Sequence, residues 1–116
     1  MTEADSKTPL PWLIAHRGAM AEAPENTFAA FDRAFSYGVD GVELDVQLTM
    51  DGHPVLFHDD AIRRITGRPG AIGDYTLREL EAFDYGSWFS QDFHDQKIPT
   101  LSDVLNRYAR SGILMI

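Results

Sequence analysis

The chain has 116 residues and a formal net charge of −8 at pH 7. This acidic balance argues against a nucleic-acid surface and against adhesion to anionic membranes. The sequence contains no cysteine, which excludes disulfides and thiolate metal sites. The length suits one domain with a modest core, and no apolar run is long enough to span a bilayer.

Residues 1–10 are expected to form a flexible tail ahead of a single domain over residues 11–116. The first eight residues are polar and lack the basic start and apolar middle of a signal peptide. We therefore expect a cytoplasmic protein.

The run Trp12–Ala15 is almost entirely apolar, which predicts a short strand covered on both faces. It ends in His16, Arg17 and Gly18. A histidine and an arginine at the end of a strand suit a polar site at the rim of a parallel sheet. A capped turn with a surface arginine is the alternative.

A helix is expected next, because Phe28, Phe31 and Phe35 form an apolar stripe at helical spacing. Asn26 or Thr27 can cap this helix, and Gly38 can end it. The helix returns the chain to a second strand, and a strand, helix, strand succession is typical of a parallel sheet.

Apolar and polar residues alternate from Val42 to Leu48, which predicts one strand with Glu43 and Asp45 on the same face. Carboxylates two positions apart stand about 7 Å apart at their backbones, so both side chains can converge on one hard cation. A solvated face is the alternative. After a turn at 50–52, an apolar run leads to His58, which can reach the same place.

The chain is less regular from residue 61 to 97. Residues 63–67 look like an irregular loop, and Thr76 with Glu79 forms a capping box that begins a short helix. The aromatic and acidic stretch 85–95 is a long loop, of the kind that often serves as a lid or an insertion. His53 and His94 are taken as surface or insertion residues.

Thr100 can cap a further helix, whose expected buried stripe is Leu101, Val104, Leu105 and Tyr108. The apolar run 113–116 then predicts a buried parallel strand, and the chain stops inside it. We therefore expect a truncated domain.

Polar residues thus end or follow three expected strands: His16, Arg17, Glu43, Asp45 and His58. In parallel α/β sheets and barrels, sites lie at the carboxyl ends of the strands. Carboxylates suit Ca²⁺ or Mg²⁺, two histidines can exchange protons, and an arginine suits a phosphate oxygen. The combination indicates metal-assisted phosphoester hydrolysis.

Five motifs in order carry a more specific resemblance: H-R-G (16–18), P-E-N-T (24–27), V-E-L-D-V-Q-L-T-x-D-G (42–52), P-V-L-F-H-D (54–59) and I-P-T-L (98–101). Together they resemble the glycerophosphodiester phosphodiesterase family. The resemblance implies a TIM-type (β/α)₈ barrel, here about its first half, with an insertion at about 61–97. It also implies hydrolysis of glycerophosphodiesters to glycerol 3-phosphate and an alcohol, with one divalent cation, Ca²⁺ or Mg²⁺.

The resemblance assigns roles to six residues. Glu43 and Asp45 match metal ligands, and His16 and His58 match the catalytic histidines. Two residues match the substrate side of the site: Arg17, which contacts the phosphate, and Glu25, which lies in or near the site. A further glutamate ligand normally follows the run that matches 113–116. The sequence R-I-T-G at 64–67 departs from the usual R-T-T-G.

Two readings follow. In one, the chain is the amino-terminal part of a phosphodiesterase that acts on a small-molecule glycerophosphodiester. In the other, it is a non-catalytic half-barrel that binds a cation weakly or acts only with another chain, with possible self-association through its open barrel edges.

Overall fold

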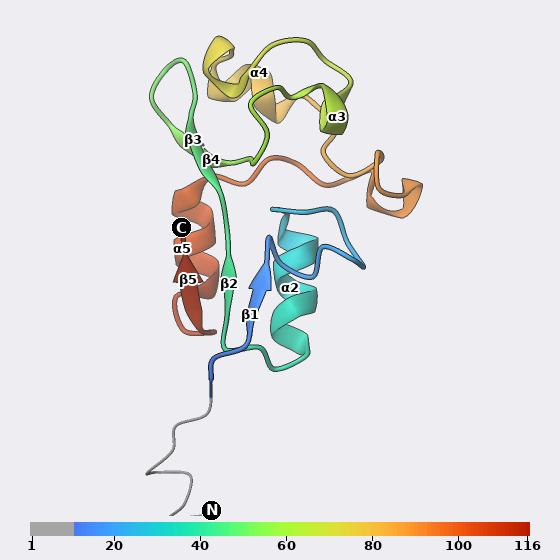
Figure 1. Ribbon diagram of the computed structural model, residues 1–116. Helices are drawn as coiled ribbons and strands as arrows, with labels where there is room; N and C mark the ends of the chain where they lie inside the picture. Colours follow the sequence, from blue (N-terminus) through green and yellow to red (C-terminus); the bar gives the residue numbers. More distant parts are fainter. Residues whose placement is uncertain (1–10) are drawn as a thin grey trace, which may run out of the picture.

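Three short strands form a parallel sheet in the computed structural model, which describes residues 11–116. The strands are β1 (Ile14–His16), β2 (Gly41–Glu43) and β5 (Ile113–Met115). Their order is β1-β2-β5, and both pairings are parallel (Figure 1). The three carboxyl ends therefore meet at one edge of the sheet.

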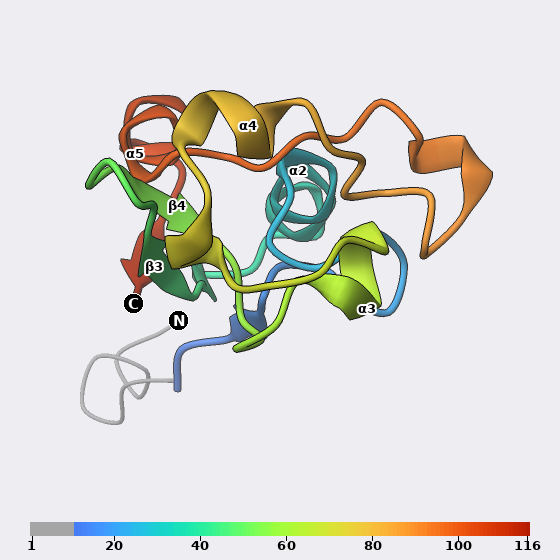
Figure 2. The same cartoon turned by 90° about the horizontal axis from the view of Figure 1, so that it is seen from above.

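Helices α2 (Phe28–Ser36) and α5 (Leu101–Tyr108) lie side by side on one face of this sheet (Figure 2). The Tyr108 ring packs against the rings of three phenylalanines of α2, at centroid distances from 5.3 to 6.3 Å. At the surface, the Arg107 guanidinium donates to the Asp32 carboxylate at 2.6 Å. Aromatic packing and an ion pair thus fix the two helices against each other.

The register of the sheet decides which side chains face these helices. Ala15, Val42 and Leu114 are paired across the sheet, and all three belong to the cluster that includes the helices. Because successive side chains of a strand point to opposite faces, the next row points the other way. That row contains His16 and Glu43.

Both long helices begin where the sequence predicts. The Thr27 hydroxyl accepts from the Ala30 backbone at 3.3 Å and caps α2, and Thr100 caps α5 in the same way. Gly38 follows α2 with a φ of +80°, a left-handed conformation that glycine adopts without penalty. The expected stripe on α5 is wrong at Leu105, which is 45% exposed.

The single strand expected over residues 42–48 is two strands. After Leu44 the chain leaves the parallel sheet, and β3 (Val46–Leu48) pairs antiparallel with β4 (Pro54–Leu56). Because the Asp45 carbonyl accepts from the Phe57 backbone at 2.9 Å, the hairpin takes over the backbone pairing at this point. The strand before His58 is therefore no part of the parallel sheet, and Leu48 is exposed.

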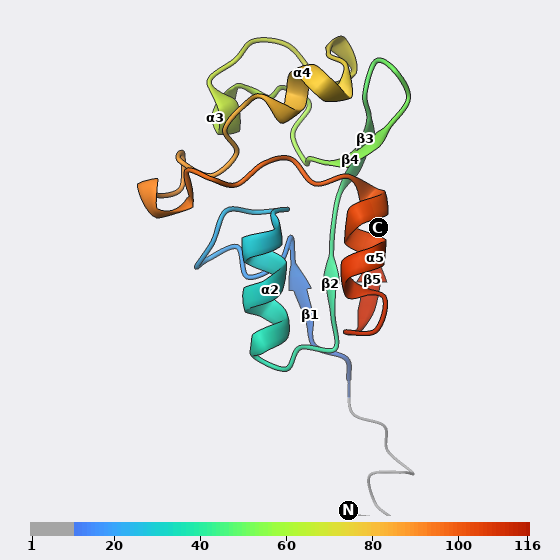
Figure 3. The same cartoon turned by 180° about the vertical axis from the view of Figure 1, so that it is seen from behind.

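The segment 61–97 lies with the hairpin at the carboxyl ends of the parallel strands (Figure 3). Its elements are α3 (Arg63–Thr66), a 3₁₀ turn (Ile72–Asp74), α4 (Leu77–Glu81) and a second 3₁₀ turn (Gln91–Phe93). The irregular loop expected at 63–67 is thus a short helix, which ends at Gly67. The segment has its own hydrophobic cluster, formed with Val55 and Phe57 of the hairpin.

Two further expectations on burial are wrong. Trp12 and Leu13 are largely exposed, because β1 begins only at Ile14 and lies at an edge of the sheet. At the other edge, β5 is parallel as expected, but Met115 and Ile116 are exposed because within residues 11–116 β5 pairs with β2 alone. The expected tail at residues 1–10 lies outside the described residues.

No helix within residues 11–116 is long and apolar enough to cross a membrane. The division into a tail, a domain over 11–116 and an insertion at 61–97 stays a prediction.

Gly18 lets α2 approach the H-R-G turn, and substitution should show this. A Cβ on Gly18 would lie 2.8 Å from the Ala30 Cβ, whereas a Cβ on Gly38 meets nothing within 4 Å, and both residues have positive φ. We expect Gly38→Ala to lower the free energy of unfolding by about 1–2 kcal/mol, the cost of the left-handed conformation. Gly18→Ala should lose about 1–3 kcal/mol more through overpacking. Urea unfolding measures both, and equal losses would contradict the close approach.

Candidate active site

His16 and Glu43 are paired in the register of β1 and β2, on the sheet face opposite the helices. The His16 Nε2 atom lies 3.7 Å from Glu43 Oε1, too far for a hydrogen bond. Glu43 Oε1 is buried and has no hydrogen-bond partner among the described residues. A buried carboxylate oxygen without a hydrogen bond is costly, so this atom is a candidate ligand for a cation.

Arg17 follows β1 with a left-handed φ of 55°, and its backbone N–H donates to the Glu43 carbonyl at 2.8 Å. This turn brings the guanidinium to two acidic residues. Nη1 donates to Glu25 Oε2 at 3.2 Å, and Nε lies 3.5 Å from Asp45 Oδ2. Nε itself is buried and makes no hydrogen bond within the described residues, so its contact with Asp45 is an ion pair alone.

Glu25 lies in the loop before α2, and its side chain is only 7% exposed. Two guanidinium groups flank the carboxylate in this buried position. Arg17 approaches from the end of β1, and Arg64 of α3 donates through Nη2 at 2.9 Å to the same Oε2 atom. The Arg64 guanidinium also lies over the Trp88 ring, 5.1 Å from its centroid.

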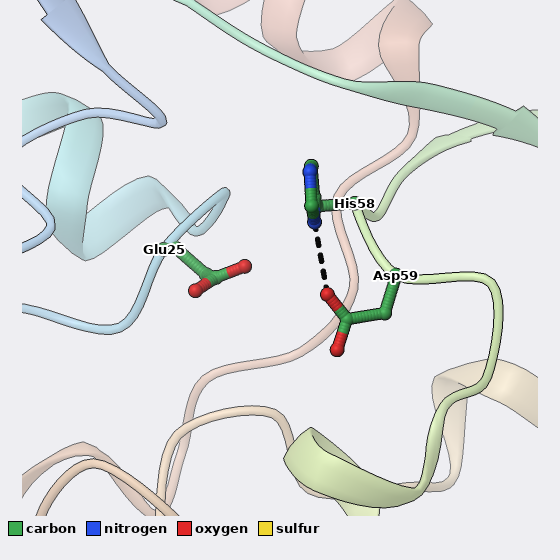
Figure 4. A group of neighbouring side chains, drawn as sticks. All are labelled: Glu25, His58 and Asp59. Atoms are coloured by element: carbon green, nitrogen blue, oxygen red, sulfur yellow. Dashed lines mark hydrogen bonds and ion pairs between the residues drawn. The ribbon is translucent and has the colours of Figure 1, made fainter.

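His58 and Asp59 follow the hairpin and face Glu25 (Figure 4). The His58 Nδ1 atom is 2.9 Å from Asp59 Oδ1. Arg64 forks onto Asp59, with Nε donating to Oδ2 at 2.8 Å and Nη2 to Oδ1 at 3.2 Å. The Gln47 side-chain amide donates to the backbone carbonyls of Phe57 and Asp59, which fixes this turn.

The pKa of the Asp59 carboxyl is lowered to about 2, mainly by the hydrogen bonds from Arg64 and also by His58, while desolvation opposes the shift. Asp59 is therefore ionised at neutral pH and can only accept hydrogen bonds. It follows that the His58 Nδ1 carries a hydrogen and donates it. The other ring nitrogen, Nε2, is then free to exchange a proton.

Two places could receive a divalent cation. Glu25, His58 and Asp59 offer ligand atoms that all lie within 4.8 Å of one another. However, Arg64 is hydrogen-bonded to both carboxylates of this group, so a guanidinium already neutralises it. Glu43 is different, because its buried oxygen has no partner among the described residues and suits a hard cation.

The structure brings the six residues singled out from the sequence into two groups of side-chain contacts, which the backbone hydrogen bond from Arg17 to Glu43 joins. His16 meets Glu43, Arg17 meets Glu25 and Asp45, and Glu25 faces His58. It does not place Glu43 and Asp45 on one continuous strand, since the chain leaves the sheet between them. The roles of these residues stay predictions.

Three contributors were missed from the sequence: Asn26, Asp59 and Arg64. Asn26 bonds Asp45 with its side-chain amide, at 3.1 Å. Asp59 and Arg64 lie inside two of the sequence motifs described above, F-H-D and R-I-T-G. A carboxylate directly after a histidine was the available signal, because it can orient the ring.

Comparison with known proteins agrees with this geometry. Residues 16–115 match the model of the glycerophosphoryl diester phosphodiesterase family. That match covers most of the sequence, and the chain belongs to this family.

The relatives include a glycerophosphodiester phosphodiesterase of Caldanaerobacter subterraneus subsp. tengcongensis, 50% identical over 92 residues, which are 79% of this chain and 38% of the relative. The crystal structure of a glycerophosphodiester phosphodiesterase from Agrobacterium tumefaciens matches with a TM-score of 0.88 and 35% identity, over 90% of this chain and 46% of that one. An Oleispira antarctica phosphodiesterase, solved in complex with the product sn-glycerol-3-phosphate, matches with a TM-score of 0.85 and 41% identity, over 94% of this chain and 44% of its own.

The chain thus spans less than half the length of these relatives. For the part that it covers, the expected portion of a (β/α)₈ barrel is confirmed, because the fold matches family members with TM-scores of 0.88 and 0.85.

The pKa of Asp59 should depend on Arg64. In Arg64→Gln we expect this pKa to rise from about 2 toward the ordinary aspartate value, because the dominant hydrogen bonds are lost. Since the folded-state pKa lies below the unfolded one, the stabilisation is present above the unfolded value and disappears as the pH falls through about 2. NMR titration of the carboxyl group measures the shift.

The control is Arg63→Gln, because Arg63 is exposed and is not among the partners of Asp59. It should leave the titration of Asp59 unchanged. An equal shift in both variants would show that general charge, and not the Arg64 fork, sets the pKa.

Proposed function

We propose that these residues form the amino-terminal part of an active site that hydrolyses glycerophosphodiesters to glycerol 3-phosphate and an alcohol with the help of a divalent cation. One observation carries the proposal: His16 lies beside Glu43, whose Oε1 has no hydrogen-bond partner among the described residues, and Arg17 and His58 both lie beside Glu25. The family membership and the product complex of the Oleispira relative support it.

Glu43 and Asp45 are the proposed ligands of the cation, Ca²⁺ or Mg²⁺, because both ions prefer carboxylate oxygens. When bound, the cation would polarise the phosphoryl oxygens and help to activate a hydroxyl group. The unpaired oxygen of Glu43 fits such an ion.

The remaining residues bind the phosphate and move protons. The Arg17 guanidinium, which lies between Glu25 and Asp45, is the proposed donor to a phosphate oxygen. His58 would exchange its proton at Nε2, because Nδ1 is committed to Asp59. His16, at the end of β1, is the second proposed acid or base, and its half-exposed ring is open to substrate. The cytoplasmic location expected from the sequence stays a prediction.

Cation binding is the first test. Calorimetric titration of the chain with Ca²⁺ and with Mg²⁺ should show binding that Glu43→Gln and Asp45→Asn each weaken, because each removes a charged ligand. Glu81→Gln is the control, since this glutamate is exposed on α4. Undiminished binding in both site variants would place the ion elsewhere, with the Glu25, His58 and Asp59 group as the next candidate.

The histidines should matter for turnover in a longer protein that joins this segment to the rest of the barrel. His16→Ala and His58→Ala should each lower kcat by about 10²- to 10⁴-fold, the usual contribution of a positioned acid or base. Both lie at the ends of strands, so folding should change little. His94→Ala is the matched control, because His94 is exposed and bonds only a local carbonyl. Near-normal turnover in either site variant would refute its role in proton transfer.

A second candidate is a non-catalytic half-barrel that binds a cation weakly or pairs with another chain. The edges of the described sheet favour it, because β1 and β5 each have one neighbour there. Release of glycerol 3-phosphate from glycerophosphocholine or glycerophosphoethanolamine, with Ca²⁺ or Mg²⁺ present, separates the two. Light scattering tests the predicted self-association.

A further inference from the structure

Asn26 occupies an unusual position in the loop between β1 and α2. It is 4% exposed and has a left-handed φ of 55°. The sequence allowed either Asn26 or Thr27 as the cap of α2, and Thr27 takes that role. The buried amide of Asn26 is therefore free for another contact.

That contact is Asp45, which lies where the chain leaves the parallel sheet. Asn26 Nδ2 donates to Asp45 Oδ2 at 3.1 Å, and the Asp45 backbone N–H approaches Asn26 Oδ1 at 3.4 Å. One amide side chain thus meets the backbone and the carboxylate of the same residue. The Asn26 backbone N–H donates to the Arg17 carbonyl at 3.0 Å, which anchors the amide to the end of β1.

The second neighbour of Asp45 Oδ2 is a competitor. Arg17 Nε makes no hydrogen bond within residues 11–116, but it forms an ion pair with this oxygen at 3.5 Å. A direct bond between them would be charge-assisted and stronger than the bond from a neutral amide. Without Asn26, Arg17 Nε and Asp45 Oδ2 could form a direct hydrogen bond. Neither the aspartate nor the arginine donor would then be available to a ligand of the site.

We propose that Asn26 is a positioning residue that keeps Asp45 available to a divalent cation. The amide holds Asp45 Oδ2, and within residues 11–116 no hydrogen bond reaches Oδ1, which is left for the ion. This inference rests on the proposed function of Asp45 as a ligand. It assigns to the asparagine of the P-E-N-T motif a role that neither helix capping nor turn formation explains.

The competing explanation is conformational. Asparagine is enriched in the left-handed region, and glycine adopts this region more easily still. If the backbone alone mattered, glycine would serve at position 26 as well as asparagine. Glycine, however, cannot bond Asp45.

The test compares Asn26→Gly with Asn26→Ala, because both remove the amide while only alanine strains the left-handed backbone. Calorimetry with Ca²⁺ should show that both variants lose affinity by a similar factor, about 10- to 100-fold, as is usual when a residue that orients a metal ligand is removed. In urea unfolding, the glycine variant should have the higher midpoint of the two. Asn106→Ala, an exposed position on α5, should leave the affinity unchanged.

Two results would overturn the role of Asn26. One is parental affinity in Asn26→Gly. The other is a loss of affinity that parallels the loss of stability in urea, so that Asn26→Ala binds Ca²⁺ more weakly than the parent and Asn26→Gly does not. In both cases Asp45→Asn would still weaken binding, which leaves the proposed function intact. If Asp45→Asn binds as well as the parent, or the parent binds no Ca²⁺, the ligand role of Asp45 fails and this inference fails with it.

Discussion

Two guanidinium groups share the buried carboxylate of Glu25, and the arrangement of the site depends on this contact. Arg17 comes from the end of β1 and Arg64 from α3, so one oxygen atom joins the parallel sheet, the loop before α2 and the segment 61–97. Removal of Glu25 would leave both guanidinium groups without this shared partner, and removing one partner of a buried ion pair typically costs about 3–5 kcal/mol. Glu25 also lies next to His58 and Asp59, so a change at one residue would be felt across the site.

The four residues before α2 show how closely the site and the fold are connected. Pro24 offers its carbonyl to the Thr27 hydroxyl, and Thr27 caps the helix. Between them, Glu25 binds the arginines and Asn26 holds Asp45. The turn that starts the helix thus also supplies two site contacts, and a helix fixed by its cap and by packing keeps both in place.

The sequence predicted the parts of this molecule that depend on local patterns. Helix α2 follows from the phenylalanine spacing and a threonine cap, and the six proposed site residues follow from short motifs. The break after Leu44 could not be predicted in this way. Alternation from Val42 to Leu48 has the same period whether the chain forms one strand or two. The break depends instead on a contact distant in the sequence, the backbone hydrogen bond from Phe57 to Asp45. The role of Asn26 was hidden for a related reason, since caps and left-handed turns favour the same residue types.

Strand β4 separates two hydrophobic cores. Its neighbouring residues Val55 and Leu56 point to opposite sides, and Val55 packs with the segment 61–97 while Leu56 packs with α2 and α5. Such clusters can open as separate cooperative units with their own free energies of opening. His58, Asp59 and Arg64 lie between residues of the cluster that contains Val55. His16 and Glu43 lie next to residues of the cluster that contains Leu56. Amide hydrogen exchange would therefore resolve two levels of protection. The cluster that contains Val55 could open, and separate the site residues, while the sheet and its helices remain folded.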